Sequence, residues 1–171
     1  MIYDRELLAK LDQLRASPWR GDVFRHMFGD YPPERENQRG ARWNPPETPA
    51  IYTSLTRVAA LAEADFHISL QPIRPTARRT IYRIGVVLDS VVDLSDRSRL
   101  AALGISDDDL TSLDHRPCQR VGGAIEWLEN DGLLVPSARA DGMNLVIFPN
   151  QQKAGYEFWV IGSEVIEAGH D

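Results

Sequence analysis

Apolar residues recur at helical spacing in two stretches of the chain. Residues 5–16 (RELLAKLDQLRA) place four leucines on one helical stripe, Leu7, Leu8, Leu11 and Leu14. Ser17-Pro18 ends this pattern, which predicts an amphipathic packing helix. Residues 56–70 (TRVAALAEADFHISL) are apolar around almost the whole helix, and Thr56 or Ser54 can cap its start. The second pattern therefore predicts a largely buried helix.

Short apolar runs bounded by turn residues predict strands in the rest of the chain. They occupy residues 22–28, 50–54, 133–138, 143–148 and 157–166. A longer β-rich run over residues 78–95 is interrupted at Asp89-Ser90, which predicts either two strands or one bent strand.

Three further helices are expected between these strands. Residues 96–104 and 106–113 predict short helices, and Ser106 with three aspartates behind it is typical of a helix start. Residues 118–132 predict a longer helix, with Gly132 as its C-cap.

The order of these elements indicates the fold class. Helices and strands are mixed without regular βαβ alternation, so we expect an α+β fold with mixed or antiparallel sheets and flanking helices. The 171 residues, 43% of them hydrophobic, suit one globular domain. Within it we expect an N-terminal packing helix in residues 1–18 and the main body in residues 19–171.

Composition and charge exclude several classes of protein. No apolar run approaches the roughly 20 residues that a membrane span needs, and the start does not read as a signal peptide. The single cysteine, Cys118, suits a reducing compartment, so we expect a soluble, cytoplasmic protein without membrane contact. A net charge of −6 argues against direct nucleic-acid binding. The arginines between residues 74 and 83 are the local exception.

A stiff loop over residues 31–48 is the first candidate for chemistry. Pro45, Pro46 and Pro49 restrict the backbone near Arg42 and Trp43. A guanidinium held in this way suits bidentate binding of phosphate or carboxylate, and a tryptophan can stack on a ring. The alternative is that Trp43 fills the edge of the core while Arg42 pairs with a surface acid.

Glu63 is the most anomalous acid in the sequence. It lies in the middle of the largely apolar helix over residues 56–70, so its carboxylate must be paired, hydrogen-bonded or kept neutral. A structural ion pair and a catalytic role both fit this position.

Tyr52 and Ser137 are the remaining polar candidates. Tyr52 points to the opposite face of its strand from Ile51, so it packs in the core or lines a site. Ser137 interrupts two apolar strands, and without a GxSxG motif it suits a binding hydroxyl or an ordinary loop serine better than a nucleophile.

Four segments, taken together and in this order, resemble the RES domain, the toxin half of a class of bacterial toxin–antitoxin pairs. They are VFRHMF (residues 23–28), GARWNPPETPAIYTS (40–54), AALAEADF (59–66) and RVGGAIEWLENDGLLVPSARADGMNLVIFP (120–149). The family is named after an arginine, a glutamate and a serine, which match Arg42, Glu63 and Ser137. Tyr52 and Arg25 match a further tyrosine and arginine of the family.

The resemblance implies a fold similar to ADP-ribosyltransferases and an enzyme that degrades NAD by hydrolysis or phosphorolysis. It implies no metal and no other cofactor, with phosphate as a possible co-substrate. The implied partner is an antitoxin with a helix-turn-helix-like region. Transfer of ADP-ribose to a protein and a catalytically silent, partner-binding domain stay open as alternatives.

On this resemblance we expect the catalytic residues to be Glu63, Arg42 and Tyr52. The expected substrate-binding residues are Arg25, Trp43, Ser137 and Arg139. The sequence departs from the family where Ala41 precedes Arg42, and where Glu47 replaces a glycine that is common near the end of the loop. Glu47 would add negative charge beside a phosphate site.

Overall fold

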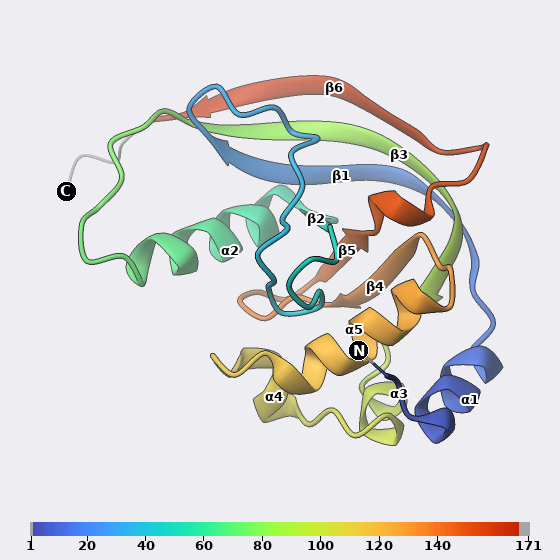
Figure 1. Ribbon diagram of the computed structural model, residues 1–171. Coiled ribbons are helices and arrows are strands. Elements are labelled where there is room, and N and C mark those ends of the chain that lie inside the picture. Colours follow the sequence, from blue (N-terminus) through green and yellow to red (C-terminus); the bar gives the residue numbers. More distant parts are fainter. Residues whose placement is uncertain (1, 168–171) are drawn as a thin grey trace.

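The computed structural model describes residues 2–167 of the chain (Figure 1). In chain order its elements are α1 (Arg5–Gln13), β1 (Ser17–Phe28), β2 (Ile51–Ser54), α2 (Arg57–Ser69), β3 (Arg79–Asp93), α3 (Arg97–Ala102), α4 (Asp107–Thr111), α5 (Arg116–Trp127), β4 (Gly132–Pro136), β5 (Met143–Ile147), the 3-10 turn η1 (Pro149–Gln151) and β6 (Glu157–Ile166). These elements confirm the predicted α+β class with a mixed sheet.

The strands form one sheet that folds back on itself. Their order is β1-β2-β5-β4-β3-β6, and β1 pairs in addition with β3. The sheet can fold back because β3 is long enough to pair with β1, β6 and β4. The strand β3 is antiparallel to β1 along Arg79–Val91 and to β6, and its last residues run parallel to β4.

Two apolar cores hold the layers together. Figure 1 shows β1, β3 and β6 above, β2, β4 and β5 in the middle, and α1, α3, α4 and α5 below. One core, with Val23, Ile84 and Leu145, lies between the two halves of the sheet. The other packs the helices on the opposite side of β2, β4 and β5. The helix α2 is separate from the other helices and lies against β1.

Local capping explains the helices that the sequence predicts. The Thr56 hydroxyl accepts a hydrogen bond from the backbone N–H of Ala59 at 3.1 Å and caps α2. Ser106 and Asp109 bond each other's backbone N–H in a capping box at α4. Both predicted caps are therefore confirmed.

Two predicted boundaries are wrong, and both depend on contacts between distant segments. The strand β1 begins at Ser17 instead of residue 22, because residues 17–21 pair with the second half of β3. Gly132 does not cap α5, which ends at Trp127, and Glu129 takes the positive φ of 66°. Gly132 instead starts β4, where a Cβ would lie 2.8 Å from the Leu88 side chain.

A buried carboxylate supports β3 at Asp89 and Ser90. Asp131 is 0% exposed, and its two oxygens accept the backbone N–H groups of Asp89 at 2.9 Å and Ser90 at 2.8 Å. This support keeps β3 a single strand at the point where the sequence allowed either a break or a bend.

We predict that Asp131→Asn lowers the free energy of unfolding by about 1–2 kcal/mol, because an amide can accept only one of the two bonds. Urea unfolding measures the change. Asp93→Asn is the control, since that exposed carboxylate accepts one bond from Ser95, and its effect should stay within about 0.5 kcal/mol. Equal losses in the two variants would contradict the role of Asp131.

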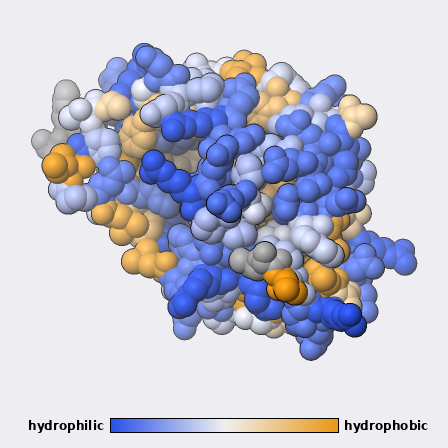
Figure 2. Space-filling view, viewed as in Figure 1, coloured by the Kyte–Doolittle hydropathy of each residue, from blue (hydrophilic) through white to orange (hydrophobic). Residues whose placement is uncertain are grey.

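The face of the molecule seen in Figure 2 is mostly hydrophilic. Figure 2 shows polar side chains over most of the viewed face, with hydrophobic ones gathered at the left, over the end of α2 and the segment that follows. In that part of the chain Leu70 and Ile73 are 52% and 82% exposed. Among residues 2–167 no helix has the length and hydrophobicity that a membrane crossing requires.

Candidate active site

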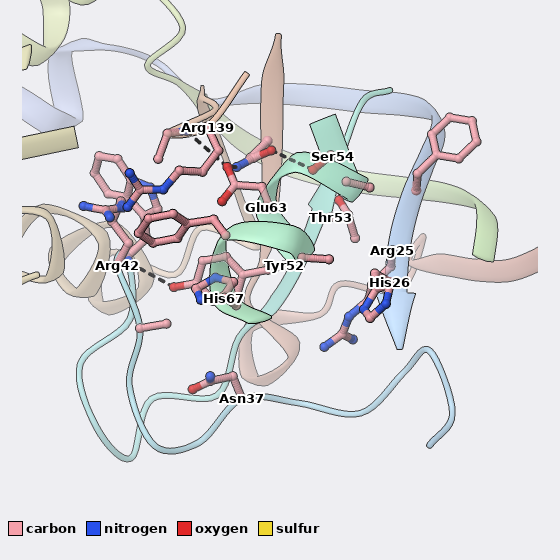
Figure 3. A pocket seen from close by; sticks show the side chains of 18 of the residues that line it. Arg25, His26, Asn37, Arg42, Tyr52, Thr53, Ser54, Glu63, His67 and Arg139 are labelled. Atoms are coloured by element: carbon pink, nitrogen blue, oxygen red, sulfur yellow. Dashed lines mark hydrogen bonds between the residues drawn. The ribbon is translucent and has the colours of Figure 1, made fainter. Parts of the chain in front are cut away.

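A cavity of about 570 Å³ lies between β1, β2, α2 and the loop over residues 31–48. Six of the seven residues expected at a site contribute to its wall, namely Arg25, Arg42, Trp43, Tyr52, Glu63 and Arg139. The seventh, Ser137, lies behind the wall in contact with Glu63. Segments far apart in the sequence are thus brought together around one cavity (Figure 3).

The Glu63 carboxylate is held by three donors on one oxygen. Its Oε1 accepts hydrogen bonds from the Ser137 hydroxyl at 2.7 Å, the Ala138 backbone N–H at 3.1 Å and the Asn144 amide at 2.9 Å. No residue in the described range forms an ion pair with it. The structural ion pair that the sequence left open is therefore absent there, and all three hydrogen bonds fall on Oε1 and none on Oε2.

Asn144 is a functional candidate that the sequence analysis missed. Its amide oxygen accepts from the Ser54 hydroxyl at 2.8 Å, which fixes the amide so that its nitrogen donates to Glu63. The chain Ser54, Asn144, Glu63 therefore orients the carboxylate. A signal was present, because Asn144 is a polar residue inside a strand that otherwise reads as apolar.

Arg42 is anchored by backbone carbonyl groups. Its Nη1 donates to the carbonyl oxygens of Asp109 and Ser112, both at 2.9 Å, at the end of α4. This arrangement differs from the surface ion pair that was one alternative. Its guanidinium group also contacts the Cys118 thiol, and the donors not used in these contacts can serve a ligand.

Trp43 is only 2% exposed and belongs to the core between the sheet and the helices. Such burial does not support a stacking role on a substrate ring. Its peptide group instead fixes the loop, because the Trp43 carbonyl oxygen lies where a Cβ on Gly122 would be, at 1.8 Å. The glycine of α5 therefore lets the loop approach the helix closely.

Tyr52 faces away from Ile51, as its place in the strand predicts, and supports the same loop. Its hydroxyl donates to the Asn44 side-chain oxygen at 2.6 Å and accepts from the Trp43 backbone N–H at 2.9 Å. Burial raises the pKa of the phenol well above its usual value. The hydroxyl is therefore neutral, and both bonds position Arg42 through the neighbouring backbone.

Arg139 lies flat on an aromatic ring. Its guanidinium carbon is 3.3 Å from the centroid of the Phe66 ring, and its Nη2 donates to the Thr111 carbonyl oxygen at 3.2 Å. Burial and, to a lesser degree, the charge of Arg42 lower the pKa of Arg139. The two arginines are thus close enough to feel each other's charge, and both bind the end of α4.

Arg25 lies at the opposite end of the cavity from Arg42, with Tyr52 between them (Figure 3). Its Nη1 donates to the Pro33 carbonyl oxygen, which ties it to the loop. Burial lowers the pKa of Arg25 to about 10, partly offset by Glu34, so the side chain stays charged at neutral pH. Arg35 lies near it and covers the Tyr31 ring at 3.6 Å.

Three histidines in the wall were also missed by the sequence analysis. His67 and His115 face Arg42 and Arg139. Burial is the largest cause that lowers the pKa of each histidine, and the two positive charges lower it further. Nearby acids raise these pKa values but do not cancel the effect. His26, at the Arg25 end, accepts a hydrogen bond from Arg79 at 2.9 Å. Scattered single histidines gave no spacing that could have revealed them.

We predict that His26 titrates far below an ordinary histidine. Burial, with a smaller effect of Arg79, lowers its pKa from 6.5 to about 4. Between these values the unfolded chain binds a proton that the folded chain does not, so stability is lost as the pH falls from about 6.5 to 4. The NMR signal of His26 should shift near pH 4, and His26→Gln should lose less stability over this window. A midpoint near pH 6.5 would contradict the prediction.

The basic segment after α2 is not part of this site. Arg78, Arg79 and Arg83 form ion pairs with Asp30, Asp65 and Asp22. Glu47 is exposed and does not line the cavity, so its charge does not act where the sequence suggested. It takes a φ of 72°, a conformation that favours glycine. In the part of the chain described, no group of three histidine, cysteine or acidic side chains could hold a metal ion.

Comparisons with known proteins found relatives that cover most of this chain. The chain is 28% identical over 162 residues to the NAD(+) phosphorylase MbcT of Mycobacterium bovis and of Mycobacterium tuberculosis, covering 89% of this chain and 86% of each relative. The crystal structure of the M. tuberculosis MbcT–MbcA toxin–antitoxin complex contains a chain that superposes with a TM-score of 0.84. That match has 27% sequence identity and covers 95% of this chain and 93% of the other.

The match to a protein family extends over nearly the whole chain. Residues 11–164 match the RES domain, a region that starts inside α1 and ends inside β6. It includes the loop of Arg42, the helix of Glu63 and the turn of Ser137. The chain belongs to the RES domain family.

Proposed function

We propose that this protein is a toxin that consumes NAD by phosphorolysis of the bond between nicotinamide and ribose. The observation that carries the proposal is Glu63, whose carboxylate is fixed by three donors in a cavity that also contains the arginines Arg25, Arg42 and Arg139. The similarity to proteins named NAD(+) phosphorylase supports the choice of substrate.

The chemistry of the reaction requires this combination of charges. When nicotinamide leaves, it departs as a neutral ring, and positive charge builds on the ribose. A carboxylate oxygen aimed at that position stabilises the transition state more than the ground state. We assign this role to Oε2 of Glu63, with Ser137 and Asn144 as its positioning residues.

The arginines have a different role in this proposal. NAD carries a pyrophosphate, and phosphate itself is an anion, so the substrates bring negative charge into the cavity. None of the three arginines forms an ion pair with a protein carboxylate among residues 2–167. Their charge is therefore available to hold these anions.

A protein partner that covers the cavity is part of the same proposal. Leu70 and Leu113 contribute to the wall, yet they are 52% and 67% exposed, so the rim has an apolar part. The similar chain was solved in a toxin–antitoxin complex. We infer that an antitoxin, with a helix-turn-helix-like region, covers this rim and blocks entry of NAD.

The test is NAD loss by purified protein that has been separated from any partner. We expect nicotinamide release to rise at least about 10-fold when phosphate is added, with ADP-ribose 1″-phosphate as the other product. NAD that stays intact with and without phosphate would contradict the proposal. Radioactive ADP-ribose attached to protein, without a free small product, would favour the transferase alternative.

A further inference from the structure

The positive charge in the cavity is divided between two ends. Arg42 and Arg139 lie at one end with His67 and His115. The positive charges of both arginines act on each of these histidines. Arg25 and Arg35 lie together at the other end. Figure 3 shows Arg25 and Arg42 separated by the width of the cavity.

One pyrophosphate cannot satisfy both groups of arginines at once if they are on opposite sides of the bound ribose. Phosphorolysis, however, uses two anionic substrates, the dinucleotide and inorganic phosphate. We propose that Arg42 and Arg139 bind the inorganic phosphate that attacks the ribose, and that Arg25 and Arg35 bind the pyrophosphate of NAD. This assignment rests on the proposed function.

The position of Glu63 decides which group binds which anion. The attacking phosphate oxygen must come within about 3–3.5 Å of the ribose carbon that loses nicotinamide. In the proposed function Glu63 acts at this carbon. Its negative charge acts on Arg139 and His67, so Glu63 lies near the end of the cavity that holds these two residues. The pyrophosphate is attached several bonds away, through the other end of the ribose, so it belongs at the more distant arginines.

The geometry of the first group suits a phosphate ion. The guanidinium groups of Arg42 and Arg139 are oriented by three carbonyl oxygens at the end of α4, those of Asp109, Thr111 and Ser112. Because each arginine uses only one of its nitrogens for these bonds, further N–H donors are available. A dianion between two like charges would also relieve their repulsion.

The chemical step balances without a general base. An oxygen of hydrogenphosphate that carries no proton forms the new bond to the ribose carbon, and the bond to nicotinamide breaks with its electron pair on the ring nitrogen. Nicotinamide leaves neutral, and the phosphate ester then loses its proton to solvent. Glu63 is therefore needed as an electrostatic group and not as a proton acceptor.

The experiment compares the two KM values in matched variants. Arg139→Gln should raise KM for phosphate at least about 10-fold and change KM for NAD less than about 2-fold, because a charge-assisted interaction with phosphate is lost. Arg25→Gln should raise KM for NAD at least about 10-fold and change KM for phosphate less than about 2-fold, for the same reason. Arg120→Gln is the control, since Arg120 is also bound to a backbone carbonyl, that of Leu103, but lies outside the cavity wall. It should change neither value.

Each other outcome has a defined meaning. A rise in KM for NAD that equals or exceeds the rise for phosphate in Arg139→Gln would overturn the assignment while phosphorolysis stands. A wild-type rate that is independent of phosphate would refute phosphorolysis itself, and the assignment with it. Should Arg139→Gln fail to fold, Arg139→Lys gives the same comparison, with a smaller selective rise in KM for phosphate as the expected result.

Discussion

Glu63→Gln will lower nicotinamide release at least about 100-fold while the protein keeps its fold. The glutamine oxygen can still accept the bonds from Ser137, Ala138 and Asn144, so the local structure is retained. The negative charge at the second oxygen is lost, and removal of one fixed electrostatic group of this kind costs about 10²–10³ in rate. Nicotinamide release at saturating NAD and phosphate measures the effect.

A matched substitution separates this effect from a general loss of charge. Glu164→Gln makes the same change on β6, where the carboxylate forms a surface ion pair with Arg57. It should leave the rate unchanged, because Glu164 does not line the cavity. Thermal unfolding of both variants verifies that they are folded. Turnover of Glu63→Gln near that of the wild type would contradict the role of the carboxylate.

Gly122→Ala will destabilise the protein by about 3 kcal/mol and will also reduce activity. The added Cβ would lie 1.8 Å from the Trp43 carbonyl oxygen, so the loop and α5 must move apart in a packed core. The same movement displaces Arg42, the residue before Trp43, from the end of α4. Urea unfolding and the nicotinamide assay measure the two losses.

The control for this variant is Gly162→Ala on β6. A Cβ at Gly162 meets no atom within 4 Å, so its stability should change by less than about 1 kcal/mol and its activity not at all. An unfolding free energy of Gly122→Ala close to that of the wild type would show that the loop does not need this close contact.

The helices and the residues of the site were largely accessible to sequence reasoning because their signals are local. Thr56 and Ser106 are caps within a few residues of the helices that they start. Glu63 was noticeable because a carboxylate in an apolar helix needs an explanation within that helix. Ser137 was noticeable because it interrupts two apolar strands. The family resemblance added Arg25, which has no distinctive local pattern.

What the sequence did not reveal depends on pairing between distant segments. The early start of β1 requires the second half of β3, and the place of Gly132 requires contact with Leu88. The two ends of the cavity are a further example. Arg25 and Arg42 are both expected at the site, but β1 and the loop carry them to opposite sides of Tyr52. No periodicity along the chain encodes that separation.

The most direct test of the proposed site is a crystal structure of Glu63→Gln with NAD bound, because this variant should bind the dinucleotide without cleaving it. We predict that the nicotinamide ribose lies in the cavity with its reacting carbon beside the side chain of residue 63, and that the pyrophosphate contacts Arg25. NAD bound outside this cavity, or a cavity that stays empty at saturating NAD, would contradict the assignment of this site to NAD cleavage.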